Sequence, residues 1–295
     1  METALRNLSR HEQLNFLLTN RIPRHALTRL VGWLSRIDSP RLARGLIGIW
    51  RLFTDLDLSD AQEQSFRSMQ ACFTRKLKPG ARPVDARREI VVSPCDAVVG
   101  ECGAIEGTRV FQAKGFPYEL HELIPDPAIR ETYRDGRYVT LRLRSSMYHR
   151  FHAPVACDVD AITYVSGDTW NVNPIALKRI EKLFCRNERA VIPLADLATH
   201  GSLCLVPVAA ILVASMRFTG LESGLNLDYV GPSRLRWRAR FRKGDEMGYF
   251  QQGSTILLFA TGNYALAPGI AVGTTIRMGQ ALLADTTLAA PEQTS

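Results

Sequence analysis

The stretch GYFQQGSTILLF, residues 248–259, places a Gly-Ser-Thr tripeptide directly before an apolar run. The run STILLFA (254–260) is short and apolar, which predicts a buried strand. Glycine beside serine is typical of a turn, so this pattern alone predicts Ser254 to be a turn residue. Whether the chain also does chemistry at its own Gly253–Ser254 bond depends on the rest of the sequence.

Short apolar or alternating runs of this kind fill the sequence from about residue 86 onward and are separated by Gly, Pro, Asn and Asp. They predict a mainly antiparallel β domain, a sandwich or a partly open barrel. In RLRWRARFRK (234–243) five arginines alternate with apolar residues, so period two puts them on one face. That face suits lipid phosphates, nucleic acid or plain solvent, but no nucleic-acid recognition motif accompanies it. The other runs are EIVVSP, RYVTLRLR, CDVDAITYV, SLCLVPVAAILVASM and TTIRMG.

Upstream of these runs the apolar spacing changes to that of helices. ALTRLVGWLSR (26–36) and PRLARGLIGIWRLF (40–53) each line up one apolar face, and a third helix is predicted over about 59–75. KLKPGARPVD (76–85) breaks any helix. The sequence therefore predicts an α+β chain, with N-terminal amphipathic helices in 1–80 and a β-rich domain in 81–295.

The positive charge gathers on the first two helices. The 295-residue chain carries a net charge of +8, and seven arginines stand against one acid between positions 21 and 51. Basic amphipathic helices suit an anionic membrane surface, although arginines on a packed helical subdomain would simply be solvated. The residues predicted to contact the membrane are Leu27, Leu30, Leu34, Leu46, Trp50, Arg29, Arg44 and Arg51.

Cysteine usage and hydropathy indicate a cytoplasmic setting. The six cysteines form no CxxC pair, the N-terminus has no apolar core of the signal-peptide kind, and the longest apolar run, CLVPVAAILVASM, is too short to span a bilayer. We expect reduced thiols and no membrane crossing.

Three segments offer polar groups next to apolar strands. SPCDAVVGECG (93–103) supplies Asp96, SSMYHRFHAPV (145–155) supplies His149 and His152, and the opening stretch supplies Ser254. Acid, base and hydroxyl are the parts of a nucleophilic triad. No G-x-S-x-G elbow positions the serine, so the residues taken singly favour a turn acid, loop histidines and a turn serine. Two histidines three apart also suit zinc, but no third ligand lies at a telling spacing, and we predict no metal.

Several further segments follow one another in a recognisable order. They are FTRKLKPGARPVD, VSPCDAVVGECG, VFQAKGFPYELHELI, YHRFHAPV, GDTWNVNP, FCRNERAV and KGDEMGYFQQGSTILLF. With these segments the chain resembles the phosphatidylserine decarboxylase proenzymes of the bacterial, membrane-associated type over nearly its whole length. The resemblance carries the family's triad onto Asp96, His152 and Ser254 and its additional active-site histidine onto His149. Gln252 and Ala97 depart from the family's usual leucine and glycine.

The resemblance implies that the chain cuts itself between Gly253 and Ser254, with chains 1–253 and 254–295 staying associated. Ser254 would become a covalent pyruvoyl group, the only cofactor, and the mature protein would convert phosphatidylserine to phosphatidylethanolamine. His152 would be the base, Asp96 would hold its tautomer, and His149 would reprotonate the product. The expected partners are the phospholipid and an anionic membrane at the cytoplasmic face of the inner membrane, without nucleic acid. A homodimer is left open.

Three other functions stay open from the sequence. The same maturation can serve a different amine substrate. An uncleaved serine hydrolase can use the same Asp-His-Ser set on an external ester, and a silent lipid-binding module would also remain whole.

Overall fold

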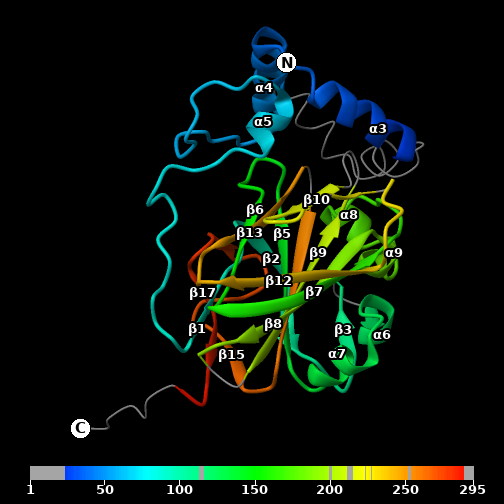
Figure 1. The fold of residues 1–295 in the computed structure, drawn as a ribbon, viewed down its shortest axis with the longest axis vertical. Coiled ribbons are helices and arrows are strands. Elements are labelled where there is room, and N and C mark those ends of the chain that lie inside the picture. The colour runs from blue at the N-terminus through cyan, green and yellow to red at the C-terminus, as the bar shows by residue number, and fades with distance from the viewer. Residues whose placement is uncertain are drawn as a thin grey trace.

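The computed structural model describes residues 24–112, 116–198, 201–210, 215–222, 224–226, 228–251 and 254–288, with side chains from residue 29 onward. Within these ranges, helices from the N-terminal part of the chain lie at one end of a β-rich body (Figure 1). The predicted α+β organisation is therefore confirmed. No helix in the described ranges has the length and apolar content needed to cross a membrane.

The first two described helices form where the apolar spacing predicts them. They are α3 (Arg24–Ser35) and α4 (Pro40–Phe53). The α4 helix begins at a capped end, because the Ser39 side chain accepts a hydrogen bond from the Leu42 amide and proline occupies the first turn.

The third predicted helix is wrong in extent. Only α5 (Met69–Phe73) is helical, and the residues before it form turns. The Ser68 side chain accepts a hydrogen bond from the Ala71 amide at 3.0 Å, which caps the helix at Met69, and Ala61 upstream forms a bridge with Leu77. The remaining helices are the short segments α6 (Leu120–Leu123), α7 (Pro127–Thr132), α8 (Pro174–Leu177) and α9 (Leu183–Arg186).

The β domain is built on an eight-stranded sheet in the order β12-β7-β8-β9-β14-β5-β2-β16, in which every neighbouring pair is antiparallel. Smaller sheets have the orders β11-β10-β13-β6, β1-β17-β15 and β3-β4. The bounds are β1 (Ile90–Val92), β2 (Ala97–Ala104), β3 (Arg109–Phe111), β4 (Pro117–Glu119), β5 (Arg137–Leu143), β6 (Arg150–His152), β7 (Cys157–Val165), β8 (Arg189–Asp196), β9 (Ser202–Ala209), β10 (Ser215–Phe218), β11 (Leu225–Asn226), β12 (Arg234–Phe241), β13 (Glu246–Phe250), β14 (Ser254–Ala260), β15 (Tyr264–Leu266), β16 (Thr275–Ile276) and β17 (Ala281–Asp285).

The strand predicted from the opening stretch is the buried β14, and it is covered on both faces. Ile256 and Leu258 belong to one apolar cluster, whereas Leu257 and Phe259 belong to a second cluster on the other face. Every residue of this strand is buried, which explains why its sequence is continuously apolar and does not alternate.

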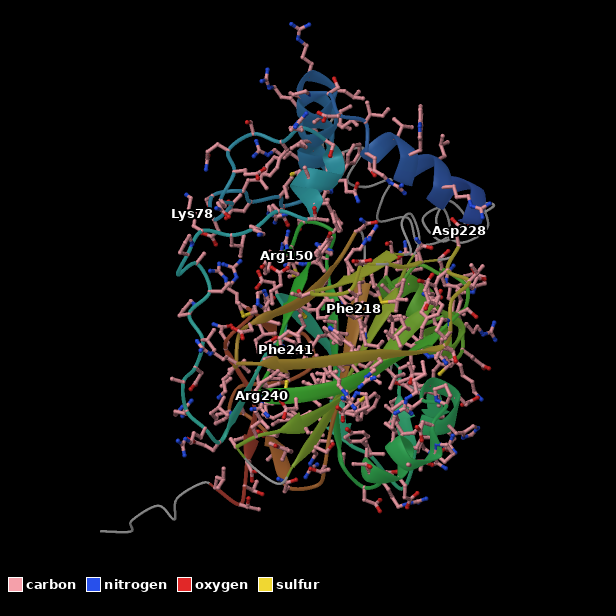
Figure 2. All side chains as sticks on the ribbon, in the orientation of Figure 1. Lys78, Arg150, Phe218, Asp228, Arg240 and Phe241 are labelled. Carbon is pink, nitrogen blue, oxygen red and sulfur yellow. The ribbon has the colours of Figure 1, made fainter. Side chains whose placement is uncertain are left out.

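The arginine-rich strand predicted over 234–243 is β12, at one edge of the large sheet. Its arginines are exposed and its Trp237 and Phe241 are buried, as period two predicts. Arg240, labelled in Figure 2, pairs with Asp158 of the neighbouring strand at 2.6 Å.

The N-terminal helices are joined to the β domain through α5 and the residues after it. The Phe73 ring packs on the His149 ring with centroids 3.9 Å apart. Arg75 donates to the Ser146 carbonyl at 3.0 Å, and Arg150 donates to the Thr74 carbonyl at 2.7 Å. These contacts hold the β5–β6 loop against α5.

Candidate active site

Ser254 is the first residue of β14 and lies inside the molecule. It pairs with Leu143 of β5 on one side and with Ala209 of β9 on the other. Its side chain is fully buried, and its hydroxyl oxygen has no hydrogen-bond partner among the described residues. Buried polar atoms are normally satisfied, so an unpaired hydroxyl at the start of a core strand indicates a functional position. Gln252 and Gly253 lie outside the described residues.

His149 lies at the end of the β5–β6 loop and is also fully buried. Its Nδ1 lies 2.8 Å from the Met147 carbonyl, and because a carbonyl only accepts, Nδ1 carries the ring proton. Its Nε2 therefore presents a lone pair, with no partner among the described residues. Burial lowers the pKa of His149 to about 3, so the ring is neutral at physiological pH.

His152, at the end of β6, has both ring nitrogens engaged. Its Nδ1 donates to the Gly244 carbonyl at 2.9 Å, and its Nε2 accepts from the Tyr148 hydroxyl at 3.0 Å. Burial lowers the pKa of His152 as well. The ring is thus a neutral base whose lone pair is occupied by Tyr148, a residue that the sequence analysis did not single out.

Asp96 comes directly before β2, as predicted, but it does not hold the tautomer of His152. Its carboxylate accepts from Arg82 Nε at 2.9 Å and from Arg82 Nη2 at 2.6 Å, and it also accepts from the Met278 amide at 2.9 Å. The Gly244 carbonyl fixes the tautomer of His152 instead. The expected Asp96–His152 hydrogen bond is therefore wrong. An arginine that donates two charge-assisted hydrogen bonds to one carboxylate makes a stronger contact than a neutral histidine can, so Asp96 pairs with Arg82.

The apolar residues predicted to contact a membrane differ in their exposure. The Leu30 side chain is 53% exposed, whereas Leu34 and Leu46 are half-buried and Trp50 stacks on Phe73 with centroids 6.0 Å apart. The Leu27 side chain lies outside the described residues. Ile49 and Phe53, which the sequence places on the apolar face of the second helix, are exposed although they were not among the predicted membrane contacts, and so are Trp33 and Leu52.

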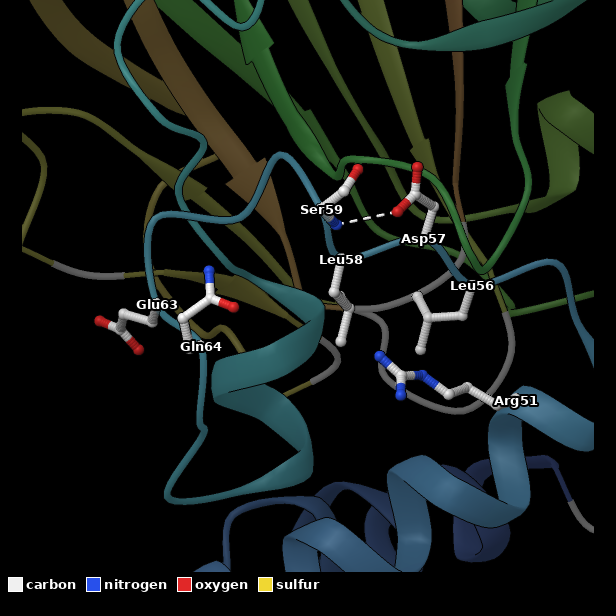
Figure 3. A pocket seen from close by; sticks show the side chains of 7 residues that line it. All are labelled: Arg51, Leu56, Asp57, Leu58, Ser59, Glu63 and Gln64. Carbon is white, nitrogen blue, oxygen red and sulfur yellow. Dashed lines mark hydrogen bonds between the residues drawn. The ribbon is translucent and has the colours of Figure 1, made fainter.

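The three predicted arginines on these helices also differ. Arg44 is exposed. Arg29 forms an exposed ion pair with Asp228 of the β domain, with the two atoms 2.7 Å apart. Figure 2 shows Asp228 beside α3. Arg51 lines a cavity of about 250 Å³ between α4 and the turns that follow it (Figure 3). The other lining residues are Leu56, Asp57, Leu58, Ser59, Glu63 and Gln64, so this cavity belongs to the helical region and contains none of the predicted catalytic residues.

Two of the predicted site residues share an unusual feature, a buried polar atom without a partner among the described residues. The unpaired Ser254 hydroxyl and the unpaired His149 Nε2 are both buried, and the β5–β6 loop that carries His149 begins at Leu143, the register partner of Ser254. The described residues contain no group of three metal-ligating side chains.

The sequence of the chain is similar to those of a known protein family. The profile of the phosphatidylserine decarboxylase family matches residues 69–284. The phosphatidylserine decarboxylase proenzyme of Methylococcus capsulatus is 35% identical over 274 residues, which cover 88% of this chain and 93% of the relative. The proenzyme of Alcanivorax borkumensis is 35% identical over 280 residues, covering 92% and 96%.

Proposed function

Because the chain belongs to the phosphatidylserine decarboxylase family, we propose that it decarboxylates phosphatidylserine to phosphatidylethanolamine after cutting itself between Gly253 and Ser254. The observation that supports this most directly is the unpaired, fully buried hydroxyl of Ser254 at the start of a core strand. An ordinary turn serine would be solvated or hydrogen-bonded.

Self-cleavage begins when the Ser254 oxygen attacks the Gly253 carbonyl carbon, which turns the amide into an ester. A base must take the hydroxyl proton, and His152 is suited to this because its Nε2 bears the lone pair. That nitrogen has to exchange the Tyr148 hydroxyl for the Ser254 hydroxyl. Elimination at residue 254 then frees the Gly253 carboxylate, and uptake of water with loss of ammonia leaves a pyruvoyl group at the start of chain 254–295.

The pyruvoyl group supplies a carbonyl that binds the substrate's amine and accepts the electron pair released as carbon dioxide leaves. The chain's own residues exclude water and handle protons. The His149 ring is held by Phe73 and Met147 in one orientation, and its Nε2 has no partner among the described residues. After taking a proton from solvent, Nε2 would deliver it to the former α-carbon, which gains one proton when carbon dioxide leaves.

The helical region supports action at a membrane surface. A two-tailed lipid leaves a bilayer at a cost of about 0.8 kcal/mol per exposed CH₂, so the enzyme has to meet its substrate there. Exposed Trp33 and Phe53 and the exposed Arg44 supply α3 and α4 with the apolar and cationic groups that such a surface binds. We place the protein at the cytoplasmic face of the inner membrane, with its two chains associated.

The mass of the purified protein tests the proposal. We expect two chains, 1–253 and 254–295, with the smaller one carrying a pyruvoyl group and no free amino terminus. Ser254→Ala should stay whole, whereas Ser233→Ala, an exposed serine on the loop before β12, should still be cut. The cleaved protein should release carbon dioxide from phosphatidylserine and not from free serine. An uncut parent, or a cut Ser254→Ala chain, would refute the proposal.

A further inference from the structure

The Asn-Glu-Arg segment before β8 contains two residues whose side chains are fully used by the fold. Asn187 donates to the Trp170 and Ala209 carbonyls at 2.9 and 2.8 Å. Arg189 donates to the Leu123 carbonyl at 2.8 Å and to other backbone carbonyls nearby. These two residues tie loops to the sheet, so their role is structural.

Glu188, between them, is different. Its side chain is fully buried, and the Tyr164 hydroxyl lies near its carboxyl and lowers its pKa as a hydrogen-bonding group. That hydroxyl donates to the Asn226 carbonyl at 3.0 Å, so neither carboxyl oxygen of Glu188 has a donor in hydrogen-bond geometry among the described residues. Burial raises the pKa of Glu188 to about 8. A buried carboxyl without a cation or a firm donor costs stability, which a purely structural residue would not be expected to retain.

Glu188 lies in the same cross-strand row as Ser254. The Ala209 amide donates to the Glu188 carbonyl at 2.8 Å, and Ala209 is the register partner of Ser254. Residues directly opposite one another in a sheet point to the same face, so the Glu188, Ala209 and Ser254 side chains share one face. Their two backbones are two strand spacings apart, about 10 Å.

Only the methyl group of Ala209 stands in the row between the carboxyl and the serine. The carboxyl lies near Tyr164 of β7, on the side of β8 away from β14. Turned across Ala209 instead, an extended glutamate side chain and one hydrogen bond of about 3 Å would cover most of the gap to an amine attached at residue 254. The neighbouring even-numbered residues Ala190 and Ile256 belong to the apolar cluster on this face, so the carboxyl has a low-dielectric setting.

We propose that Glu188 is a further catalytic residue, which binds the amino group of the lipid headgroup and exchanges a proton with it. This inference rests on the proposed function. The headgroup amine arrives as an ammonium and must lose one proton before it can react with a carbonyl. The Glu188 carboxylate takes that proton and becomes the neutral acid, and it returns the proton to the oxygen that leaves as water. No other reactant is needed.

The pH dependence follows from the ionised form being the active one. The carboxyl of the free enzyme is protonated below its pKa and ionised above it, so kcat/KM should rise as pH increases through about 8. The groups that face it from the packed elements are Tyr164, which lowers this pKa, and Asp228, whose charge raises it. His149 stays neutral throughout this range.

The test uses the full-length, self-cleaved protein and the variant Glu188→Gln, which keeps the shape of the neutral acid. Ethanolamine and cyanoborohydride trap an amine on the smaller chain, and mass spectrometry counts the trapped fraction without any decarboxylation. We expect self-cleavage to be unchanged, which would also show that the variant has folded. The rate of amine capture should fall by a factor of about 10² to 10⁴. The rising limb of kcat/KM near pH 8 should disappear. Glu106→Gln, at an exposed glutamate, should behave as the parent.

Glu188→Asp is the second variant, and it should keep the pH limb while capturing amine at an intermediate rate. Parent-like capture and an unchanged pH limb in Glu188→Gln would overturn the inference. So would loss of self-cleavage in both Glu188 variants, since Glu188 would then act in maturation or folding. If the parent itself is not cut, or releases no carbon dioxide, the proposed function fails instead.

Discussion

Replacing Asp96 with alanine should lower the free energy of unfolding, and this loss has to be measured before any effect on catalysis can be interpreted. The carboxylate binds Arg82 through two nitrogens, and the two side chains are 9% and 10% exposed. Breaking a buried pair from one side costs about 3–5 kcal/mol, because the other charge is left without its partner. Arg82 keeps Asp60 at 2.8 Å, a carboxylate that is 42% exposed, so we expect the lower end, about 3 kcal/mol.

Urea unfolding of the uncut Ser254→Ala chain, with and without Asp96→Ala, measures this change. For an unfolding slope of about 3 kcal/mol/M the midpoint should fall by about 1 M. The control is Asp158→Asn, which breaks the exposed ion pair with Arg240 and should leave the midpoint within error.

A double variant separates the two roles of Asp96. Replacing Asp96 and Arg82 together by methionine removes both buried charges, so most of the lost stability should return. If self-cleavage returns with it in a chain that keeps Ser254, Asp96 acts only by supporting the fold around Arg82. A fall of less than about 1 kcal/mol in Asp96→Ala would refute the reasoning, since the pair would then not be buried in solution.

Other consequences can be measured in the same preparations. Because burial lowers the pKa of His149 to about 3 from an unfolded value of 6.5, the unfolded chain takes up the extra proton, and the stability that this residue contributes falls by about 2 kcal/mol as the pH is lowered from 7 to 5. His152 and Glu188 also titrate differently in the folded chain, so the measured quantity is a difference: in urea unfolding at both pH values the parent should lose about 2 kcal/mol more than His149→Gln. Gly45→Ala, with open space around its Cβ in α4, should stabilise the chain by about 1 kcal/mol. Gly248→Ala, whose Cβ would lie 2.2 Å from the Arg217 carbonyl, should destabilise it, and thermal melting compares the two. Replacing Trp33 and Phe53 by serine should weaken binding to anionic vesicles in a flotation assay without slowing self-cleavage, and unchanged flotation would contradict the membrane assignment.

The sequence predicted those elements whose cause is local. The α4 helix carries its own proline and capping serine, and β14 is a continuous apolar run, so both were found with their bounds. The third helix was overextended because a helical pattern over 59–75 does not reveal that the Ser68 side chain caps the backbone at the Ala71 amide and so begins α5 at Met69. Helix periodicity was outweighed there by side-chain hydrogen bonding.

The site was predicted as a set of residues but not as a set of bonds. Asp96, His152 and Ser254 were singled out through family motifs, yet no motif spacing reveals that Arg82 lies within reach of Asp96. Tyr148 escaped attention because a tyrosine beside a histidine is ordinary in sequence, and only its 3.0 Å contact with Nε2 gives it meaning. Glu188 needed the sheet register, since the row that joins it to Ser254 spans residues 66 positions apart.

The boundary between the helical region and the catalytic domain is less clean than the sequence composition predicts. The family profile begins at Met69, the first residue of α5, and Phe73 of that helix packs directly on His149. Arg75 also holds the loop that carries His149, through the Ser146 carbonyl. A helix that the sequence groups with the N-terminal region therefore packs on the histidine proposed to be catalytic. The proposed contact of α3 and α4 with lipid would thus be connected to the proposed active site through α5, whose Phe73 also stacks on Trp50 of α4.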